Sequence, residues 1–451
     1  MKKRILAMIL ALLCVVMCLT GCGAGKSNET TAPEDDAAAD GAETTADAAE
    51  TGETEDEPTA EAAEKITVVT WEENSTPYFP ALLEAFKADT GIEVEVVNFD
   101  GGEYDEKLSV TLAAQPDYDV IFFKNPQTLQ SAVEKNQVLP MNDYLTNTEL
   151  DLSTFSGLFE ALTAPDGNTY GAPYRKDFQV LYYNKDMFDA AGVDYPADGM
   201  TLEDFRALCQ QIASGEGNDR IYACTELGFG DYLDMAVRAG EFNRNDPATY
   251  EAVLPYYEVL LAMQKDDATI PDYAETKATQ NLMRFVNGES AMMMVGTWMT
   301  GHMLPDGAFP VEFAWDVRCM PSLNGVGNTA GEGSVTPVAI GANASNPDGA
   351  WKFIEYAVGE KGASILAEHA TVPACTSDAV IEVIQSVEGI PEDYGDYISL
   401  DTYYMAYEMA PKSGETTQLV NQTYDLIMTY TETPEEATAE LKADAEALLD
   451  S

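Results

Sequence analysis

The feature that most constrains the fold is a regular alternation of strand and helix patterns near the start of the apolar part of the chain. Three short apolar runs have the length of buried strands, at residues 66–71, 92–97 and 119–123. Two segments between them have helical periodicity, at residues 78–90 and 104–114. Gly91 is placed to end the first of these helices. This β-α-β-α-β order predicts a mostly parallel sheet with helices on its faces, and therefore fold class α/β.

Polar side chains directly follow two of these predicted strands. Glu72 and Asn74 come after the first strand, and Lys124 and Asn125 come after the third. Open parallel sheets bind ligands in the loops beyond the carboxyl ends of their strands. We therefore predict that these four residues contact a ligand.

A second α/β region follows the first. Residues 179–183 form another apolar run of strand length, and Thr201–Asp204 has the form of a capping box that opens an amphipathic helix. Near the end of the chain, Thr433 followed by Pro434 is a clear helix start. The chain has no tandem repeat of short period.

The amino terminus has the order of parts of a bacterial signal peptide. Lys2, Lys3 and Arg4 precede a short apolar run that ends in Leu19-Thr20-Gly21-Cys22. The last four residues resemble a lipobox, in which the cysteine is lipidated and becomes the first residue of the mature chain. The alternative, an uncleaved transmembrane helix, needs a longer apolar run than this one. We predict a lipoprotein signal peptide at 1–22, with Cys22 carrying palmitate-type acyl chains.

The next segment, residues 23–64, differs sharply in composition from the rest of the chain. It holds fourteen acidic residues, one lysine and no aromatic residue. Such a segment buries too little apolar surface to offset its conformational entropy, and its like charges repel one another. We expect a disordered acidic tether that lets the following body range above a membrane.

Charge, histidine content and cysteine content limit the function classes. The formal net charge of −54 argues against binding to nucleic acid or to anionic headgroups. With two histidines, His302 and His369, far apart in sequence, neither a zinc site nor a histidine-based catalytic dyad is indicated. The four cysteines of the body permit two disulfides or four buried thiols: Cys209, Cys224, Cys319 and Cys375.

Four segments of the body form a recognisable set: ITVVTW with FKADTGIEVEVV, then APDGNTYGAPYRKDFQVLYYNKDMFDAAGV, FVNGESAMMMVGTWMTG and VTPVAIGANASNPDGAWKFIEYAV. Together they resemble the extracellular solute-binding proteins of carbohydrate ABC importers, which are similar in fold to maltose-binding protein. The order of the segments matches the family over about residues 65–450. Two details depart from the family pattern: Gln115–Val120 before the third strand, and Thr201-Leu202 where a tryptophan is usual.

The resemblance implies a two-lobe, periplasmic-binding-protein-like (type II) fold with discontinuous lobes and a hinge. Lobe 1 would comprise 65–175 and 321–372, and lobe 2 would comprise 176–320 and 373–451. The chain would cross between lobes near Pro173–Phe178, Asp316–Pro321 and Thr371–Ala374.

The resemblance also suggests ligand contacts in the cleft between the lobes. Trp298 lies in the family's Gly-x-Trp loop, Tyr174 and Arg175 lie at a crossing, and Glu332 lies in a glycine-rich loop, with Tyr403 and Tyr404 as weaker candidates. Other residues have plainer interpretations. Trp71 suits core or cleft equally, Trp351 suits the core, His302 suits the surface better than a ligand contact, and residues 292–294 suit a buried strand.

These expectations together describe a lipid-anchored, extracytoplasmic solute-binding protein of an ABC importer. It would bind a sugar or oligosaccharide and pass it to permease subunits. It would be a monomer and would need no cofactor or metal. It would not be an enzyme. Two alternatives stay open at this point: the same fold holding a polyamine or other small cation with carboxylates and aromatic rings, and a lipid-anchored glycoside hydrolase with two carboxylates about one bond.

Overall fold

The computed structural model describes residues 64–74, 76–226, 228, 230–279, 281–400 and 402–451, which belong to one compact body. The predicted signal peptide, its Cys22 and nearly all of the predicted tether lie outside the described residues. These predictions therefore stay predictions. No helix among the described residues combines the length and the apolar character needed to cross a membrane.

The predicted opening unit is confirmed. Strand β1 (Lys65–Thr70) pairs in parallel with β2 (Glu93–Asn98) and with β3 (Val120–Phe122). Helices α2 (Tyr78–Thr90) and α3 (Tyr104–Leu112) connect them, and α2 ends at Gly91 in the left-handed conformation with φ 74°. A residue with a Cβ would be strained there, which explains the glycine.

One long strand, β4 (Ala172–Asn184), joins the two parts of the sheet. Its first half pairs antiparallel with β8 (Gly331–Ile340), and its second half pairs antiparallel with β6 (Ser290–Gly296) on one edge and β7 (Trp315–Cys319) on the other. β5 (Tyr222–Thr225) and β9 (Tyr403–Met405) add in parallel to β6 and β8. The strand order is β2-β1-β3-β8-β4-β6-β5, with β7 on β4 and β9 on β8.

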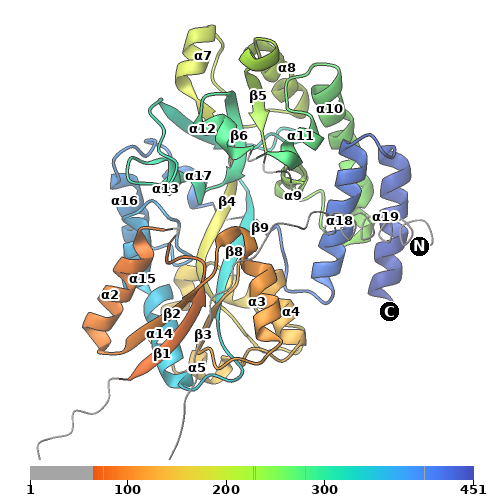
Figure 1. The fold of residues 1–451 in the computed structure, drawn as a ribbon. Coiled ribbons are helices and arrows are strands. Elements are labelled where there is room, and N and C mark those ends of the chain that lie inside the picture. Colours follow the sequence, from red (N-terminus) through yellow and green to blue (C-terminus); the bar gives the residue numbers. More distant parts are fainter. Residues whose placement is uncertain (1–63, 75, 227, 229, 280, 401) are drawn as a thin grey trace, which may run out of the picture. The chain divides into compact units, whose positions relative to one another are not determined.

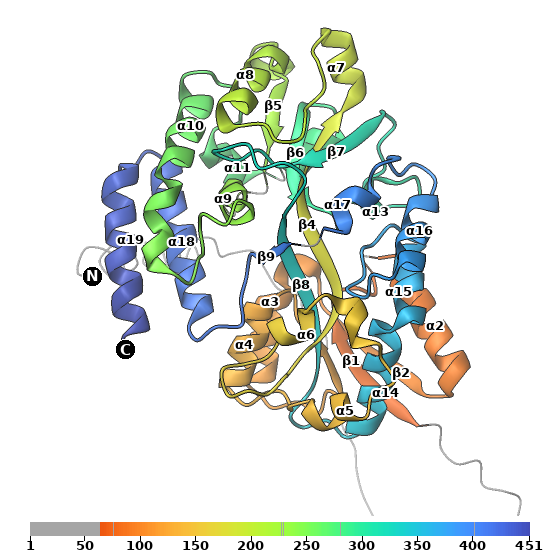
Figure 2. The ribbon, with the colours of Figure 1, turned by 180° about the vertical axis from the view of Figure 1, so that it is seen from behind.

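The expectation of a mostly parallel sheet therefore holds within the opening unit, β1 to β3. The sheet as a whole is mixed, because the return strand β8 runs antiparallel to both β3 and β4. Figures 1 and 2 show β4 and β8 running side by side from the first three strands to the part that holds β5 and β6.

Helices cover both parts of the sheet. The further α-helices are α4 (Pro126–Glu134), α5 (Asn142–Thr146), α6 (Leu158–Ala161), α7 (Lys185–Ala191), α8 (Leu202–Ile212), α9 (Asp234–Arg238), α10 (Leu254–Lys265), α11 (Tyr273–Ala278), α12 (Leu282–Val286), α13 (Met299–Met303), α14 (Pro347–Val358), α15 (Glu360–Ala367), α16 (Asp378–Ser386), α17 (Gly395–Ile398), α18 (Ser413–Met428) and α19 (Pro434–Leu449). The capping box that opens α8 at Thr201 and the Thr433 cap of α19 are confirmed.

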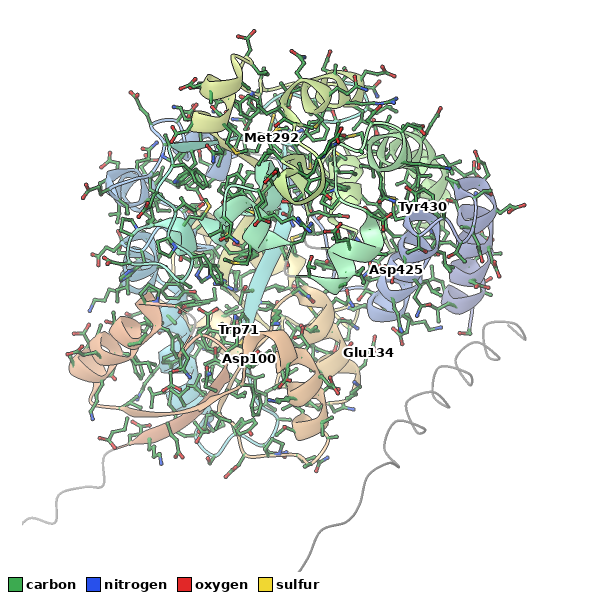
Figure 3. The ribbon with its side chains drawn as sticks, turned by 45° about the horizontal axis from the view of Figure 1, so that its top comes forward. Trp71, Asp100, Glu134, Met292, Asp425 and Tyr430 are labelled. Carbon is green, nitrogen blue, oxygen red and sulfur yellow. The ribbon has the colours of Figure 1, made fainter. Side chains whose placement is uncertain are left out.

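The part of the sheet formed by the second half of β4 and by β6 separates two hydrophobic cores. Along the second half of β4, Val180 and Tyr182 pack into one core, whereas Leu181 and Tyr183 pack into the other. β6 divides in the same way, and its methionines 292–294 are all buried, as predicted for a strand; Figure 3 labels Met292 among the surrounding side chains. Trp351 is buried in the core and stacks on Tyr144, with ring centroids 5.3 Å apart, so its interpretation as a core residue is confirmed.

The four cysteines of the body are free and buried: Cys209, Cys224, Cys319 and Cys375. Of the two alternatives that the sequence left open, the structure shows buried thiols. Burial raises the pKa of the Cys319 thiol to about 11, which keeps it protonated and unreactive near neutral pH.

Three segments run together where the two parts of the sheet meet. The backbone N–H of Ala374 donates to the backbone oxygen of Tyr174 at 3.1 Å, and the backbone N–H of Lys176 donates to the backbone oxygen of Val372 at 3.2 Å. Strand β8 pairs with the same stretch of β4. The predicted crossings near 173–178 and 371–374 lie in this triple pairing. Residues 316–321 do not, because β7 pairs with the distal half of β4. The lobe boundaries themselves stay a prediction.

A glycine sets the closeness of β8 and β4 at this junction. A Cβ added to Gly333 would lie 1.7 Å from the backbone oxygen of Asp177, which no side-chain movement can relieve. We expect Gly333→Ala to lower the free energy of unfolding by about 1–3 kcal/mol through overpacking. Urea denaturation monitored by circular dichroism measures this change.

The matched control for that substitution is Gly327→Ala, because a Cβ there would meet no atom within 4 Å. We expect this variant to unfold within about 0.5 kcal/mol of the unsubstituted protein. Equal stability of the two variants would contradict the close approach of β8 and β4.

Candidate functional site

A cavity of about 420 Å³ opens beside the triple pairing. Its lining comes from the carboxyl ends of β1 and β3, from β4, from the end of β6 with α13, from β8, and from the segment after β9. The lining residues are Trp71, Thr76, Gly101, Lys124, Asn125, Arg175, Asp177, Gln179, Gly296, Trp298, His302, Gly333, Ser334, Thr336, Ala406 and Tyr407.

The carboxyl ends of β1 and β3 meet at this cavity, as the sequence predicted for parallel strands. Lys124 follows β3 and lies over the ring of Trp71, with its Nζ 5.8 Å from the ring centroid. Its ammonium donates to the backbone oxygen of Gly101 and lies 3.8 Å from the carboxylate of Asp105. Asn125 caps α4 by accepting the N–H of Thr128 at 2.9 Å. Figure 3 shows Trp71 close to Asp100, which directly precedes Gly101.

One face of β4 supplies the central polar groups. Arg175, Asp177 and Gln179 are only partly buried and line the cavity, because alternate residues of a strand point to the same side. Tyr174 and Lys176 point to the other side and are buried. Burial lowers the pKa of Lys176 to about 8, and its amine donates to Thr376 at 3.3 Å.

A buried network fixes Arg175. Its Nε donates to Thr336 at 3.2 Å, one terminal nitrogen donates to the hydroxyl of Tyr78 at 2.8 Å, and the other lies 3.2 Å from Oε1 of Glu72. Tyr78 in turn donates its hydroxyl hydrogen to Glu72, whose side chain is fully buried. The guanidinium lies over Trp71, 5.7 Å from the ring centroid, which is cation–π range.

The opposite wall is built around Trp298. A Cβ on Gly296 would come within 2.6 Å of the Trp298 ring, so this glycine makes room for the indole. The backbone N–H of Trp298 faces the carboxylate of Asp177. His302 packs edge-on against the indole of Trp298, with ring centroids 5.8 Å apart. Burial, and then the charge of Arg175, lower the pKa of His302 to about 4, so this imidazole is neutral at ordinary pH.

Several residues singled out from the sequence do not line the cavity. Glu72 and Tyr174 are fully buried, and Asn74 and Tyr404 are exposed outside the lining. Glu332 is buried in strand β8 rather than in a loop, because β8 pairs with β4 through this stretch and with β9 beside it. Tyr403 donates to the backbone oxygens of Asp177 and Ser334, which is a bracing role within the sheet.

Sequence reasoning placed Lys124, Asn125, Arg175 and Trp298 near a ligand, and the structure brings these four together in the lining. Several other lining residues were not predicted correctly from the sequence. His302 was expected at the surface, and this is wrong, because the Trp298 loop carries it into the cavity wall. The residues that went unnoticed are Thr76, Asp177, Gln179, Ser334, Thr336 and Tyr407. The period-two pattern of polar residues from Arg175 to Gln179 was a usable signal.

The lining combines ring faces with hydrogen-bonding groups. Trp71, Trp298 and Tyr407 supply aromatic surface, and amide, hydroxyl, imidazole and charged groups alternate with them. Asp177 is the single carboxylate in this lining as the structure describes it. No cluster of three or more potential metal ligands occurs in the part of the chain that the structure describes. The lining therefore offers both ring faces and hydrogen-bonding groups to a ligand.

The mixed α/β fold is that of the two-lobe solute-binding proteins. The α/β fold class predicted from the sequence is thereby confirmed. The family model described as "Bacterial extracellular solute-binding protein" matches residues 71–364, and this chain belongs to that family.

Individual relatives are distant in sequence. A putative binding protein of Brucella abortus is 24% identical over 316 residues, which cover 65% of this chain and 71% of the relative. A sugar transporter structure from Rhizobium etli, in an open conformation, has a TM-score of 0.72 at 26% identity and covers 85% of this chain and 100% of that one. An ABC substrate-binding protein from Listeria monocytogenes in complex with cycloalternan has a TM-score of 0.73 at 20% identity, with 86% and 100% covered.

The environment of Asp177 predicts a pH-dependent contribution to stability. Burial raises the pKa of this carboxyl to about 6, although Arg175 acts in the opposite direction. The folded protein then holds a proton that the unfolded chain releases near pH 4. Compared with Asp177→Asn, the unsubstituted protein should lose about 2–3 kcal/mol of unfolding free energy as pH rises from about 4 to about 6, and no more above that.

Urea denaturation of both proteins at a series of pH values measures this difference. Asp166→Asn is the control of opposite sign, because hydrogen bonds from the Asn168 backbone and side chain lower the pKa of Asp166. The contribution of the Asp166 carboxylate to the free energy of unfolding is present above pH 4 and is lost as pH falls. A difference between Asp177→Asn and the unsubstituted protein that stays constant from pH 4 to 7 would refute the desolvation of the Asp177 carboxyl.

Proposed function

We propose that this protein binds a sugar or oligosaccharide in the cavity beside the β4–β8 junction and delivers it to the permease subunits of an ABC importer. A lipid on Cys22 would hold the protein outside the cell membrane, and no chemical step would be involved. The observation that carries the proposal is the mixture of aromatic faces and hydrogen-bonding groups that both parts of the sheet contribute to one cavity.

The chemistry of a sugar fits this lining. A pyranose ring offers flat C–H patches and a rim of hydroxyls, and aromatic rings cover such patches with rigid surface. Hydrogen bonds from charged groups to hydroxyls contribute roughly 1.5–3 kcal/mol each. The sugar transporter from Rhizobium etli and the cycloalternan complex from Listeria monocytogenes support a carbohydrate ligand, since both have this fold.

The same lining disfavours the two rival functions. A polyamine site needs carboxylates facing each ammonium group, but here Lys124 and Arg175 face the cavity with Asp177 as the carboxylate beside them. A glycoside hydrolase needs a pair of carboxylates about the scissile bond. The nearby Glu72 is fully buried and engaged by Tyr78 and Arg175, so it is not available as the second.

The strands at the junction supply the hinge of the proposed mechanism. β4 runs without a break from its pairing with β8 to its pairing with β6 and β7, and residues 372–374 pair with its first half. A ligand that touches Trp71 on one side and Trp298 on the other favours the closed arrangement by its extra contacts there. The permease would recognise that closed arrangement.

Removal of the Trp298 ring should weaken ligand binding. We expect Trp298→Ala to raise the Kd for the bound oligosaccharide about 10- to 100-fold, or ~1.4–2.8 kcal/mol, because one stacking face of the cavity is lost. The ligand is first identified by a thermal-shift screen against neutral oligosaccharides, and titration calorimetry then gives both Kd values.

Tyr404→Ala is the matched aromatic control, because Tyr404 is exposed and outside the cavity lining. Its Kd should stay within about twofold of that of the unsubstituted protein. If no carbohydrate raises the melting temperature or gives heat on titration, the proposed sugar-binding function is wrong.

The proposed anchor rests on the lipobox-like Leu19-Thr20-Gly21-Cys22. Cys22→Ala should release the protein from the membrane fraction into the medium or keep it with an uncleaved signal, because no acyl chain can be attached. Fractionation with immunoblotting, and labelling with a radioactive fatty acid, measure the outcome. Unchanged fatty-acid labelling of the Cys22→Ala variant would exclude lipidation at this residue.

A further inference from the structure

Both cations in the cavity lining are already paired with carboxylates that do not line it. Arg175 pairs with Glu72 at 3.2 Å, and Lys124 lies 3.8 Å from Asp105. Glu72 is fully buried, whereas Arg175 keeps 12% of its side chain exposed toward the cavity. A ligand therefore meets the cationic groups with their compensating charges set behind them.

Partners in the protein also hold the Arg175 guanidinium in place. Each of its three nitrogens has a partner in the protein: Thr336 at Nε, Tyr78 at one terminal nitrogen and Glu72 at the other. An arginine binds a carboxylate most strongly through two parallel N–H donors on one edge of the guanidinium. Glu72 contacts one terminal nitrogen, so a ligand carboxylate would approach a guanidinium whose charge is already compensated.

The third carboxylate near these groups faces the cavity directly. Asp177 lies on the same face of β4 as Arg175 and is part of the lining. Counting Glu72 and Asp105 behind the lining, three carboxylates accompany the two cations, so an anionic ligand gains no net attraction. A neutral hydroxyl can still accept from the remaining guanidinium hydrogens and donate to Asp177.

We propose that Glu72 is a specificity-determining residue, which neutralises Arg175 from behind the cavity wall and so makes the site select uncharged sugars over uronic acids. This inference rests on the proposed sugar-binding function. Glu72 itself touches no ligand. Its role is to set the charge that Arg175 presents, and to hold the guanidinium over Trp71.

The test compares paired probes that differ at C6 alone. Neutral di- and trisaccharides of glucose, galactose and mannose are titrated beside the corresponding glucuronate, galacturonate and mannuronate oligosaccharides. For the unsubstituted protein, the best neutral sugar should bind at least about tenfold more tightly than its uronate partner. For Glu72→Gln, which keeps the shape but removes the charge, the ratio of the two Kd values should move toward the uronate by about tenfold or more.

Glu73→Gln is the matched control, because Glu73 is the next residue in the chain and its side chain is exposed, so the substitution removes the same charge from outside the cavity wall. It should leave the ratio of Kd values unchanged, which separates the effect of Glu72 from a general change in protein charge. A role for Glu72 in folding alone would lower binding of both probes equally and leave their ratio unaltered.

Arg175→Met keeps the inference testable if Glu72→Gln does not fold. It leaves the carboxylate of Glu72 without the guanidinium, so the ratio of Kd values should move in the opposite direction, further toward the neutral sugar. The inference is overturned if the unsubstituted protein binds the uronate as tightly as the neutral sugar, or if Glu72→Gln and Glu73→Gln have equal ratios. If neither class of sugar binds the unsubstituted protein, the proposed function fails, and this inference fails with it.

Discussion

The continuity of one strand, β4, underlies the rest of the structure. Its first half pairs with β8 and its second half with β6 and β7, so a single extended segment belongs to both parts of the mixed sheet. Since strand residues alternate in direction, the same segment feeds two cores with Tyr182 and Tyr183, and directs Arg175, Asp177 and Gln179 into the cavity. The proposed hinge and the centre of the candidate site therefore share one element, so a change in its backbone alters both.

The site shows how a polar cavity is held rigid by groups that do not enter it. Arg175 is fixed by partners from the end of β1, from α2 and from β8. A charged hydrogen-bonding group that is already held in place loses less conformational freedom when a ligand arrives. Burial of Glu72 is tolerated because one carboxylate oxygen accepts from Tyr78 and Thr76, and the other forms an ion pair with Arg175 at 3.2 Å.

The sequence was informative where local signals determine structure. The first three strands, Gly91, the capping box at Thr201 and the buried methionine strand follow from periodicity and capping, which need no knowledge of distant residues. The antiparallel return of β8, the entry of His302 into the cavity wall and the burial of Glu332 depend on pairings between residues more than a hundred positions apart. Spacing along the chain carries no signal for such contacts, so these features could not be predicted. The strand ends were the exception, because parallel pairing brings Trp71 and Lys124 to the same edge.

The contrast between the charge of the chain and the charge of the cavity has a physical basis. The formal net charge is −54, yet among the described residues the cavity lining holds two cations, Lys124 and Arg175, and one carboxylate, Asp177. Exposed carboxylates are screened over about 8 Å at physiological ionic strength, whereas a buried pair such as Glu72 and Arg175 is screened far less. A ligand in the cavity therefore responds to a few buried charges at pairing distance, and the many carboxylates on the surface contribute little to its selection. For this reason the acidic composition of the whole chain, which would suggest a cationic ligand, does not determine the charge of the ligand. One glutamate behind the cavity wall can determine it.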